Sequence, residues 1–338
     1  RPIKLGVYFD QVIHAGGGYQ QALNAAILVK QLPNNLVVPI FFTRHSSNVA
    51  TLNTHGIRPV MAPLSIFDRI LLKMRRLVSD YKALGFWKKI IKSNRFERVF
   101  LNHEVDLIYF LSPCELARDL EQLNYITTLW DLCHRDSPEF PEVRAGRIFE
   151  SRERQYRMIL PKAVAILVES HLGKANVTRR FGVDENRVQV MPLTAAVATQ
   201  VSDHSQSIDD LDVRKNYEME VPYVFYPAQF WAHKNHVYLL EGLKCLEEQF
   251  GHKVGAIFSG GDQGNIQHVR NVTKKLGLTE RVRFVGFVAN EQIPCFYKQS
   301  LALVRQIRLD LKKFMAHLWA RMKLLQFAKN LIGSMVLL

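Results

Sequence analysis

Residues 3–30 read IKLGVYFDQVIHAGGGYQQALNAAILVK and indicate an α/β fold. The segment from Ile3 to Phe9 is an apolar run with β character, and a turn-rich segment with three glycines follows it. A helical pattern of apolar residues then runs from Tyr19 to Lys30. A strand, a glycine turn and a helix in this order are typical of the first unit of a doubly wound α/β domain.

The same alternation continues to about residue 195 and predicts a parallel sheet with helices on both faces. Residues 1–195 are therefore expected to form an N-terminal Rossmann-like domain. The further strands are expected at Leu36–Phe42, Asp106–Leu111, Ile126–Leu129, Ala163–Val168 and Val188–Met191. The two clearest helices are expected at Arg144–Leu160 and His171–Phe181.

Three further segments complete the predicted organisation. Residues 196–221 are polar and rich in turn formers, which predicts a linker. The alternation restarts over residues 222–304 and predicts a second Rossmann-like domain, about half the size of a full one. Residues 305–338 hold seven Lys or Arg against one Asp, with apolar residues at helical spacing, and predict a basic amphipathic helix.

Composition narrows the class of protein. The 338 residues are 48% hydrophobic and carry a net charge of +14, which suits a globular protein with an anionic partner: nucleic acid, nucleotide phosphates or an anionic membrane face. The four cysteines form no C-x-x-C pair, which favours a reducing compartment. No apolar run is long enough to span a membrane and no signal peptide is visible, so we expect a cytoplasmic protein.

The loop that follows the predicted strand at 126–129 is rich in chemically active side chains. It reads WDLCHRDSPEFPE at residues 130–142, and Asp131, His134 and Arg135 bring a carboxylate, an imidazole and a guanidinium together. Open α/β sheets bind ligands at this end of their strands, and a histidine there can exchange a proton with a sugar hydroxyl. The alternative is a loop braced by structural polar contacts.

Two glycine turns and one lysine could face phosphates. Gly16, Gly17 and Gly18 precede a predicted helix, in a pattern that is neither G-x-G-x-x-G nor a P-loop. Gly260 and Gly261 follow a strand of the second domain, and Lys234 lies near a helix start. The alternatives are plain tight turns and an exposed surface lysine.

Residues 67–92 are basic, with aromatic residues interleaved, and include Arg75, Arg76, Lys88 and Lys89. Such a segment could bind nucleic acid, lie on an anionic bilayer, or form a solvated helical face.

Taken together, these pieces resemble the bacterial family 4 (group 1) retaining glycosyltransferases, which include lipopolysaccharide and O-antigen sugar transferases. The resemblance runs from about Ile3 to Val304. It implies a GT-B fold of two facing domains, with the donor nucleotide mainly on the second and the acceptor on the first. It implies no metal and no cofactor. The segments that carry it are YPAQFWAHKNH at 226–236, WDLCHRDSPEFPE at 130–142 and SGG at 259–261.

The resemblance also assigns roles to individual positions. Asp131 and His134 match the loop near the transferred sugar and are the expected catalytic residues. Lys234 matches the basic residue on the leaving diphosphate, while Gln229 stands where the family often has Arg. The other expected contacts are Gly16, Gly17, Gly18, Gly260 and Gly261 with the donor, and Arg135, Arg75, Arg76, Lys88 and Lys89 on the acceptor or membrane side.

The C-terminal end departs from the family. After a strand like Leu301–Val304 the family has a Pro- and Gly-rich loop and then a helix with two Glu seven residues apart, which bind the donor sugar and ribose. Residues 305–338 contain no Glu, which suggests a truncated or frameshifted end.

We therefore expect a glycosyltransferase that moves a sugar from a nucleoside-diphosphate sugar to a glycan or lipid-linked acceptor, with retention. We expect peripheral contact with the inner face of the plasma membrane. The alternatives are an inactive remnant that binds a nucleotide or a membrane and, more distantly, a nucleic-acid binder. No helix-turn-helix, RRM or zinc pattern supports the last, so no nucleic-acid partner is expected.

Overall fold

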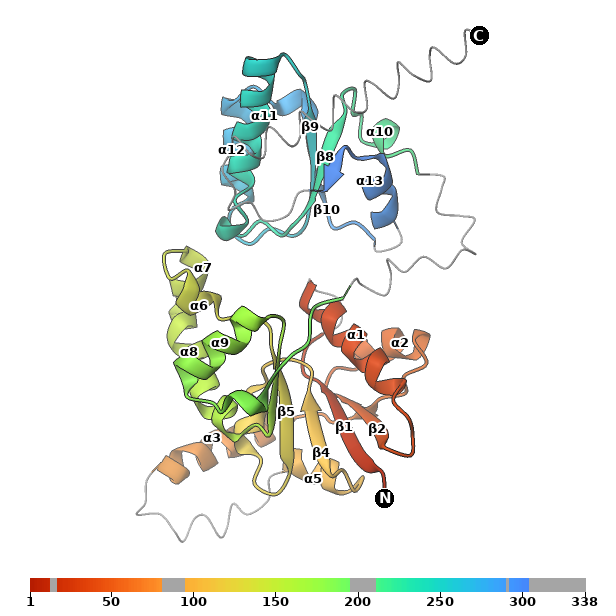
Figure 1. Cartoon of the computed structure of the whole chain (residues 1–338), viewed down its shortest axis with the longest axis vertical. Coiled ribbons are helices and arrows are strands. Elements are labelled where there is room, and N and C mark those ends of the chain that lie inside the picture. The colour runs from red at the N-terminus through yellow and green to blue at the C-terminus, as the bar shows by residue number, and fades with distance from the viewer. Residues whose placement is uncertain (13–16, 81–94, 195–210, 290–291, 304–338) are drawn as a thin grey trace. The chain divides into compact units, whose positions relative to one another are not determined.

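The computed structural model describes residues 1–12, 17–80, 95–194, 211–289 and 292–303. The chain divides into two compact units, Arg1–Glu139 with Val143–Val197 and Phe140–Glu142 with Ala198–Leu338. Each unit contains one parallel β-sheet with helices packed on both faces (Figure 1). This arrangement confirms the predicted α/β class with two Rossmann-like units.

The sheet of the first unit has seven strands in the order β3-β2-β1-β4-β5-β6-β7, all parallel. The order reverses between β1 and β4, because α1, which follows β1, packs on one face of the sheet and the short helix Glu115–Asp119, which follows β4, packs on the other. Open α/β sheets bind ligands at such a point. The strands are β1 Ile3–Phe9, β2 Val37–Thr43, β3 Val60–Met61, β4 Leu107–Phe110, β5 Asn124–Leu129, β6 Ala165–Val168 and β7 Val188–Val190.

Alternating side chains of β1 supply the two cores of this unit. Val7 and Phe9 pack with Leu23 of α1 on one face, whereas Tyr8 packs with Phe100 of α5 on the other. Both faces are therefore sealed from water, as parallel sheets require. The helices of the unit are α1 Gly17–Lys30, α2 Ser47–Thr54, α3 Ile66–Asp80, α5 Arg95–Leu101, α6 Cys133–Asp136, α8 Ile148–Ile159 and α9 His171–Phe181. The short helix α7 Pro141–Arg144 is divided between the two units, because Glu142 is the last residue of a segment that belongs to the second.

The sheet of the second unit has the strand order β10-β9-β8-β11. Val224 and Tyr226 of β8 face a core beneath α11 and α12, and Tyr223 and Phe225 face a second core beneath α10 and α13. The elements are β8 Tyr223–Pro227, β9 Gly255–Ser259, β10 Val282–Gly286, β11 Ala302–Leu303, α10 Val213–Asn216, α11 His236–Phe250, α12 Ile266–Lys275 and α13 Ile293–Gln299.

Two boundaries differ from the sequence predictions. The helix expected at Arg144–Leu160 is interrupted, because Gly146 and Arg147 both have left-handed backbone angles, and α8 starts only afterwards. The linker expected at 196–221 ends earlier, because Val213 and Met219 are buried in the core of the second unit. The predicted tail at 305–338 lies outside the described residues.

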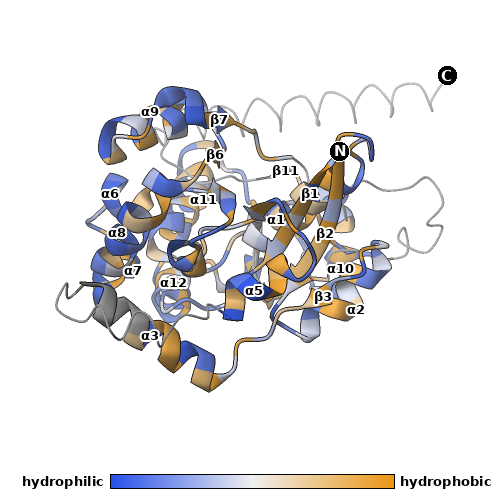
Figure 2. Cartoon of the chain, turned by 90° about the horizontal axis from the view of Figure 1, so that it is seen from below, coloured by the Kyte–Doolittle hydropathy of each residue, from blue (hydrophilic) through white to orange (hydrophobic). Residues whose placement is uncertain are grey.

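Helix α3 is fixed by a capping box at its start. The hydroxyl of Ser65 accepts a hydrogen bond from the Asp68 amide at 3.1 Å, and the Asp68 carboxylate accepts one from the Ser65 amide at 3.1 Å. The same carboxylate pairs with Arg95 at 3.3 Å, and Leu72 is buried in the core. Figure 2 shows hydrophobic and hydrophilic residues alternating along this helix. In the described part of the chain, no helix combines the length and apolar character needed to cross a bilayer.

Candidate active site

The first helix of the chain packs directly against the loop that follows β5. A Cβ atom on Gly18 would lie 2.6 Å from Cζ3 of the Trp130 indole, closer than any side chain allows. Only glycine therefore lets α1 approach Trp130 this closely. Gly17 begins α1, and Gly16 lies outside the described residues. Phosphate binding by these three glycines stays a prediction.

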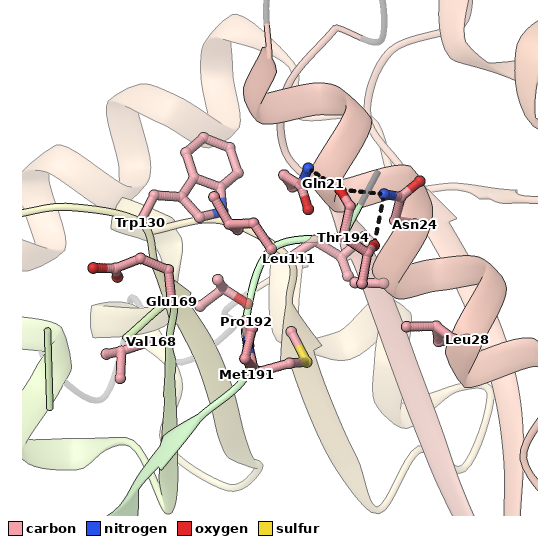
Figure 3. A pocket seen from close by; sticks show the side chains of 13 residues that line it. Gln21, Asn24, Leu28, Leu111, Trp130, Val168, Glu169, Met191, Pro192 and Thr194 are labelled. Atoms are coloured by element: carbon pink, nitrogen blue, oxygen red, sulfur yellow. Dashed lines mark hydrogen bonds between the residues drawn. The ribbon is translucent and has the colours of Figure 1, made fainter. Parts of the chain in front are cut away.

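A small pocket opens beside Trp130, at the carboxyl ends of β5, β6 and β7 (Figure 3). It encloses about 30 Å³, roughly the room of one water molecule. Two side chains of α1 hold one wall of the pocket in place. Gln21 donates a hydrogen bond to the Thr194 carbonyl at 2.9 Å, and Asn24 donates one to the Thr194 hydroxyl at 3.0 Å. Trp130 lines the opposite wall, whereas the Glu169 carboxylate is turned away from the other lining side chains and accepts a hydrogen bond from the Ser170 hydroxyl at 2.8 Å. A pocket of this size has room for a water molecule but not for a sugar.

Asp131 follows Trp130 and carries a half-exposed carboxylate. One oxygen accepts hydrogen bonds from the Cys133 amide at 2.9 Å and from Arg152 of α8 at 2.6 Å. Burial alone would raise the pKa of Asp131, but the charge of Arg152 and the hydrogen bonds with Cys133 outweigh it, so the pKa is lowered. The group is therefore a fixed anion that can accept a hydrogen bond from a hydroxyl.

His134 is completely buried beneath this loop. Its Nε2 lies 2.9 Å from Glu153 of α8, and its ring packs edge-on against Phe149 and Tyr156, with centroids 5.5 Å away in each case. Burial, aided by the charge of Arg152, lowers its pKa against the opposing effect of Glu153. The neutral ring touches no solvent, so its catalytic role stays a prediction that this conformation does not favour.

Arg135 is held by the same glutamate. Its guanidinium forms a two-pronged pair with Glu153, with Nη2 at 2.6 Å from Oε2, and lies over the Phe181 ring at 4.7 Å. The neighbouring Asp136 pairs with Arg180 of α9 at 2.6 Å. These contacts fix the loop to two helices, so the structural interpretation of His134 and Arg135 has direct support. A contact of Arg135 with an acceptor or a membrane stays a prediction.

Sequence reasoning missed the residues of α8 that hold this loop. Arg152 contacts Asp131 and also donates a hydrogen bond to the Tyr156 hydroxyl at 3.0 Å. Glu153 contacts His134 and forms an ion pair with Arg135. The only signal in the sequence is the four-residue spacing of Arg152 and Tyr156, which places both on one helix face.

In the second unit, the loop after β8 and the turn after β9 form one connected structure. The amide of Phe230 donates to the Gly261 carbonyl at 3.0 Å, and the amide of Gly260 donates to the Gly286 carbonyl at 2.8 Å. Gly260 has φ of 145°, and a Cβ there would lie 2.5 Å from the Ala228 carbonyl oxygen. This position therefore requires glycine. Donor binding by Gly260 and Gly261 stays a prediction.

Gln229 and Lys234 belong to this loop. The Gln229 side-chain oxygen accepts a hydrogen bond from the Trp231 indole at 2.9 Å, and the Lys234 carbonyl accepts one from the Tyr226 hydroxyl at 2.7 Å. Lys234 is partly exposed and directly precedes Asn235, the N-cap of α11. The lysine thus lies where the amides of a helix N-terminus add to its charge.

His236 supports this loop from inside the core. The buried ring stacks on Phe230 at 4.5 Å and also packs against Tyr226 and Phe258, at 4.8 and 5.2 Å. Burial lowers the pKa of His236 to about 4, so the ring is neutral near pH 7. Sequence reasoning quoted this residue within the segment 226–236 but gave it no role.

The fold matches that of solved GT-B glycosyltransferases. Anabaena HepE in complex with UDP and glucose is 15% identical, with a TM-score of 0.58 over 90% of this chain and 74% of that chain. A glycosyltransferase from Rickettsia africae is 13% identical, with a TM-score of 0.57 over 90% and 73%. The apo form of the lipopolysaccharide outer core galactosyltransferase WaaB is 13% identical, with a TM-score of 0.53 over 91% and 75%. At these identities the likeness establishes the fold.

The sequence of the second unit is more specific. Residues 208–308 match the family described as glycosyl transferases group 1. A search of curated proteins found no match to the chain. The group 1 part of the predicted resemblance is thus confirmed over residues 208–308. Family 4 membership, retention and an O-antigen role stay predictions.

Proposed function

We propose that the protein transfers a sugar from a nucleoside-diphosphate sugar to a glycan or lipid-linked acceptor. The observation that carries the proposal is the group 1 match, because residues 208–308 contain both connected loops at the carboxyl edge of the second sheet. HepE, which shares the fold, binds UDP in one structure and UDP-glucose in another. These findings support a nucleotide-sugar donor.

On the donor side, we assign Lys234 to the diphosphate. The residue combines a cation with the N-terminus of α11, a 15-residue helix, and both stabilise negative charge on a leaving group. In this proposal Gln229, Gly260 and Gly261 line the same donor site. The reaction then needs no metal and no cofactor, because basic side chains and helix amides offset the phosphate charge.

On the sugar and acceptor side, we assign Asp131 to a hydroxyl group and Trp130 to an apolar sugar face. Asp131 is anionic and half exposed, as a hydrogen-bond acceptor for a hydroxyl must be. His134 then acts as a positioning residue, because it holds the loop from beneath through Glu153. The roles of Gly16 to Gly18 as the glycine loop facing the donor phosphates are kept in the proposal.

In the proposed reaction, the bond between sugar C1 and the diphosphate oxygen breaks, and its electron pair leaves with the diphosphate. The acceptor oxygen forms the new bond to C1 and gives up its proton to the leaving diphosphate. Retention of configuration follows from the resemblance to family 4. A location at the inner face of the plasma membrane stays a prediction that accompanies this proposal.

The direct test is donor hydrolysis and transfer with a panel of UDP- and GDP-sugars, read as release of the nucleoside diphosphate. We expect turnover with at least one donor, and a loss of roughly a hundredfold in Lys234→Ala, the scale of one lost transition-state contact. Lys274→Ala is the matched control, because Lys274 is exposed in the last turn of α12.

Equal activity in the two lysine variants would contradict the assignment of Lys234. If the protein binds a nucleotide sugar but turns over none of the panel, the inactive-remnant alternative replaces the transferase proposal. A salt-dependent shift of generic DNA at the same protein concentration would instead support the nucleic-acid alternative.

A further inference from the structure

Helix α3 carries an apolar face that is exposed among the residues that the structure describes. Its described side chains are those of residues 66–74, and among them Ile66, Phe67, Ile70 and Met74 are 77%, 61%, 48% and 47% exposed. At 100° per residue these four positions share an arc of about 100° on the helix surface. Isolated exposed apolar residues are normal, but four on one helix face indicate an interaction surface.

The attachment of α3 fixes the direction in which this face points. Leu72 is buried in the core of the first unit, and Asp68 is tied both to Ser65 and to Arg95. On a helical wheel these two anchors lie opposite the arc of Ile66 and Ile70. The apolar face therefore points away from the unit because its other side is fastened.

Cations flank the apolar arc. Arg69 and Lys73 are both exposed and lie one helical turn apart, directly beside Ile66 and Ile70. In sequence, residues 66–94 hold eight Lys or Arg against two Asp. An apolar face bordered by Lys and Arg is the pattern of helices that lie in the surface of an anionic bilayer.

We propose that the α3 face, formed by Ile66, Phe67, Ile70 and Met74 with Arg69 and Lys73, docks the protein on an anionic lipid bilayer. A protein partner fits less well, because the cores of protein interfaces are depleted of lysine. A nucleic-acid partner leaves the aliphatic residues without a role, since binding to phosphates is carried by the cations. The inference deepens the membrane location that accompanies the proposed function, but its readout is vesicle binding, which does not require sugar transfer.

The test is cosedimentation of the full chain with vesicles of phosphatidylcholine, with and without phosphatidylglycerol. We expect binding only when phosphatidylglycerol is present. The double variant Phe67→Ser with Ile70→Ser should weaken it by roughly tenfold per side chain. Arg69→Gln with Lys73→Gln should weaken it by about fivefold per charge, and added salt should do the same.

Leu172→Ser is the matched control, because Leu172 is 70% exposed on α9 and stands outside this face. A Phe67→Trp variant gives a second readout. Subtracting the emission spectrum of the parent from that of the variant leaves the emission of the added tryptophan, and its maximum should shift to shorter wavelength when phosphatidylglycerol vesicles are added. All five substituted positions are exposed, so circular dichroism should show that the variants fold.

Two results would overturn the proposal. The parent chain could fail to bind phosphatidylglycerol vesicles. The Phe67 and Ile70 double variant could bind them as tightly as the parent; if it also loses a concentration-dependent dimer in sedimentation, the face is assigned to a second copy of the chain. Neither result bears on donor hydrolysis, which we expect all the variants to retain.

Discussion

Glu153 is the centre of the cluster that fixes the loop after β5, and removing its charge should destabilise the first unit in a pH-dependent way. Its carboxylate pairs with Arg135 and Arg157 and contacts His134. The substitution Glu153→Gln keeps the size of the side chain but removes the anion. It leaves the Arg135 guanidinium and the buried His134 ring without their charged partner.

The magnitude follows from the pKa of Glu153, which the hydrogen bond from Arg135 does most to lower, from 4.5 to about 2. Since one pKa unit corresponds to about 1.4 kcal/mol, the difference between 4.5 and about 2 corresponds to about 3.5 kcal/mol. Screening by solvent reduces the contribution of the anion to roughly 2–3 kcal/mol of the free energy of unfolding near neutral pH. The folded pKa is depressed, so this contribution is complete above the unfolded value of 4.5 and is lost as the pH falls toward 2.

The assay is urea denaturation near neutral pH and at about pH 3, read by pulsed hydrogen exchange and mass spectrometry of peptides from the first unit. Reading these peptides separates the first unit from the second. We expect the parent to exceed Glu153→Gln by roughly 2–3 kcal/mol near neutral pH and by less than half of that at about pH 3.

Glu150→Gln is the matched control, because Glu150 is exposed in the first turn of the same helix and should change stability by less than about 0.5 kcal/mol. A difference between parent and Glu153→Gln that stays constant over this pH range would refute the reasoning. It would mean that the variant loses packing rather than an ion pair.

Three further predictions concern single residues. Gly260→Ala should cost roughly 2–4 kcal/mol through its clash with the Ala228 carbonyl, while Gly264→Ala, which has positive φ but open space, should cost about 1 kcal/mol; equal losses of melting temperature would show that the clash is relieved. His236→Phe should lose less stability on acidification than the parent does. The pKa of His236 falls from 6.5 in the unfolded chain to about 4 in the folded protein, so the free energy of unfolding of the parent should drop by about 2 kcal/mol between neutral pH and about pH 5. Urea midpoints that change equally with pH in the two proteins would contradict this. Asp131→Asn should lower transfer by roughly 10–100-fold with the fold intact by circular dichroism, and unchanged turnover would remove Asp131 from the site.

The strands were the most predictable part of the fold. Buried parallel strands are continuous apolar runs, so the segments at 36–42 and 126–129 could be recognised without any tertiary information. The helix after β1 was predicted from Tyr19, and it begins two residues earlier, at Gly17. The structure adds that Gly18 is needed for contact with Trp130, which lies more than a hundred residues later in the chain.

The site was harder to predict because its partners are distant in sequence. His134 looked like a reactive group in a polar loop, but Glu153, 19 residues away, draws it under α8. The end of the linker was hard to predict for the same reason. Val213 and Met219 are only two apolar residues in a polar segment, so they form no recognisable pattern, and they are buried because β8 and α13 build a core around them. Local patterns record the propensity of a segment, whereas burial is decided by what packs against it.

The predicted membrane residues show the same limit. Arg75 and Arg76 lie in α3, where side chains beyond residue 74 are not described, and Lys88 and Lys89 lie outside the described residues. The charge of this segment was evident from sequence. The apolar face beside it became visible only once Leu72 and Asp68 showed which side of the helix is anchored.

The capping box at Ser65 and Asp68 makes the exposed apolar face of α3 sensitive to insertions and deletions in the helix, and much less sensitive to which apolar residue stands at each exposed position. Because the box fixes where α3 begins, each residue inserted between Asp68 and Leu72 would turn the following positions by about 100°. Such an insertion would swing Met74 off the exposed arc and pull Leu72 out of the core. Exchanges among Ile, Leu, Met and Phe should therefore be tolerated at the exposed positions, whereas insertions and deletions within this turn should not.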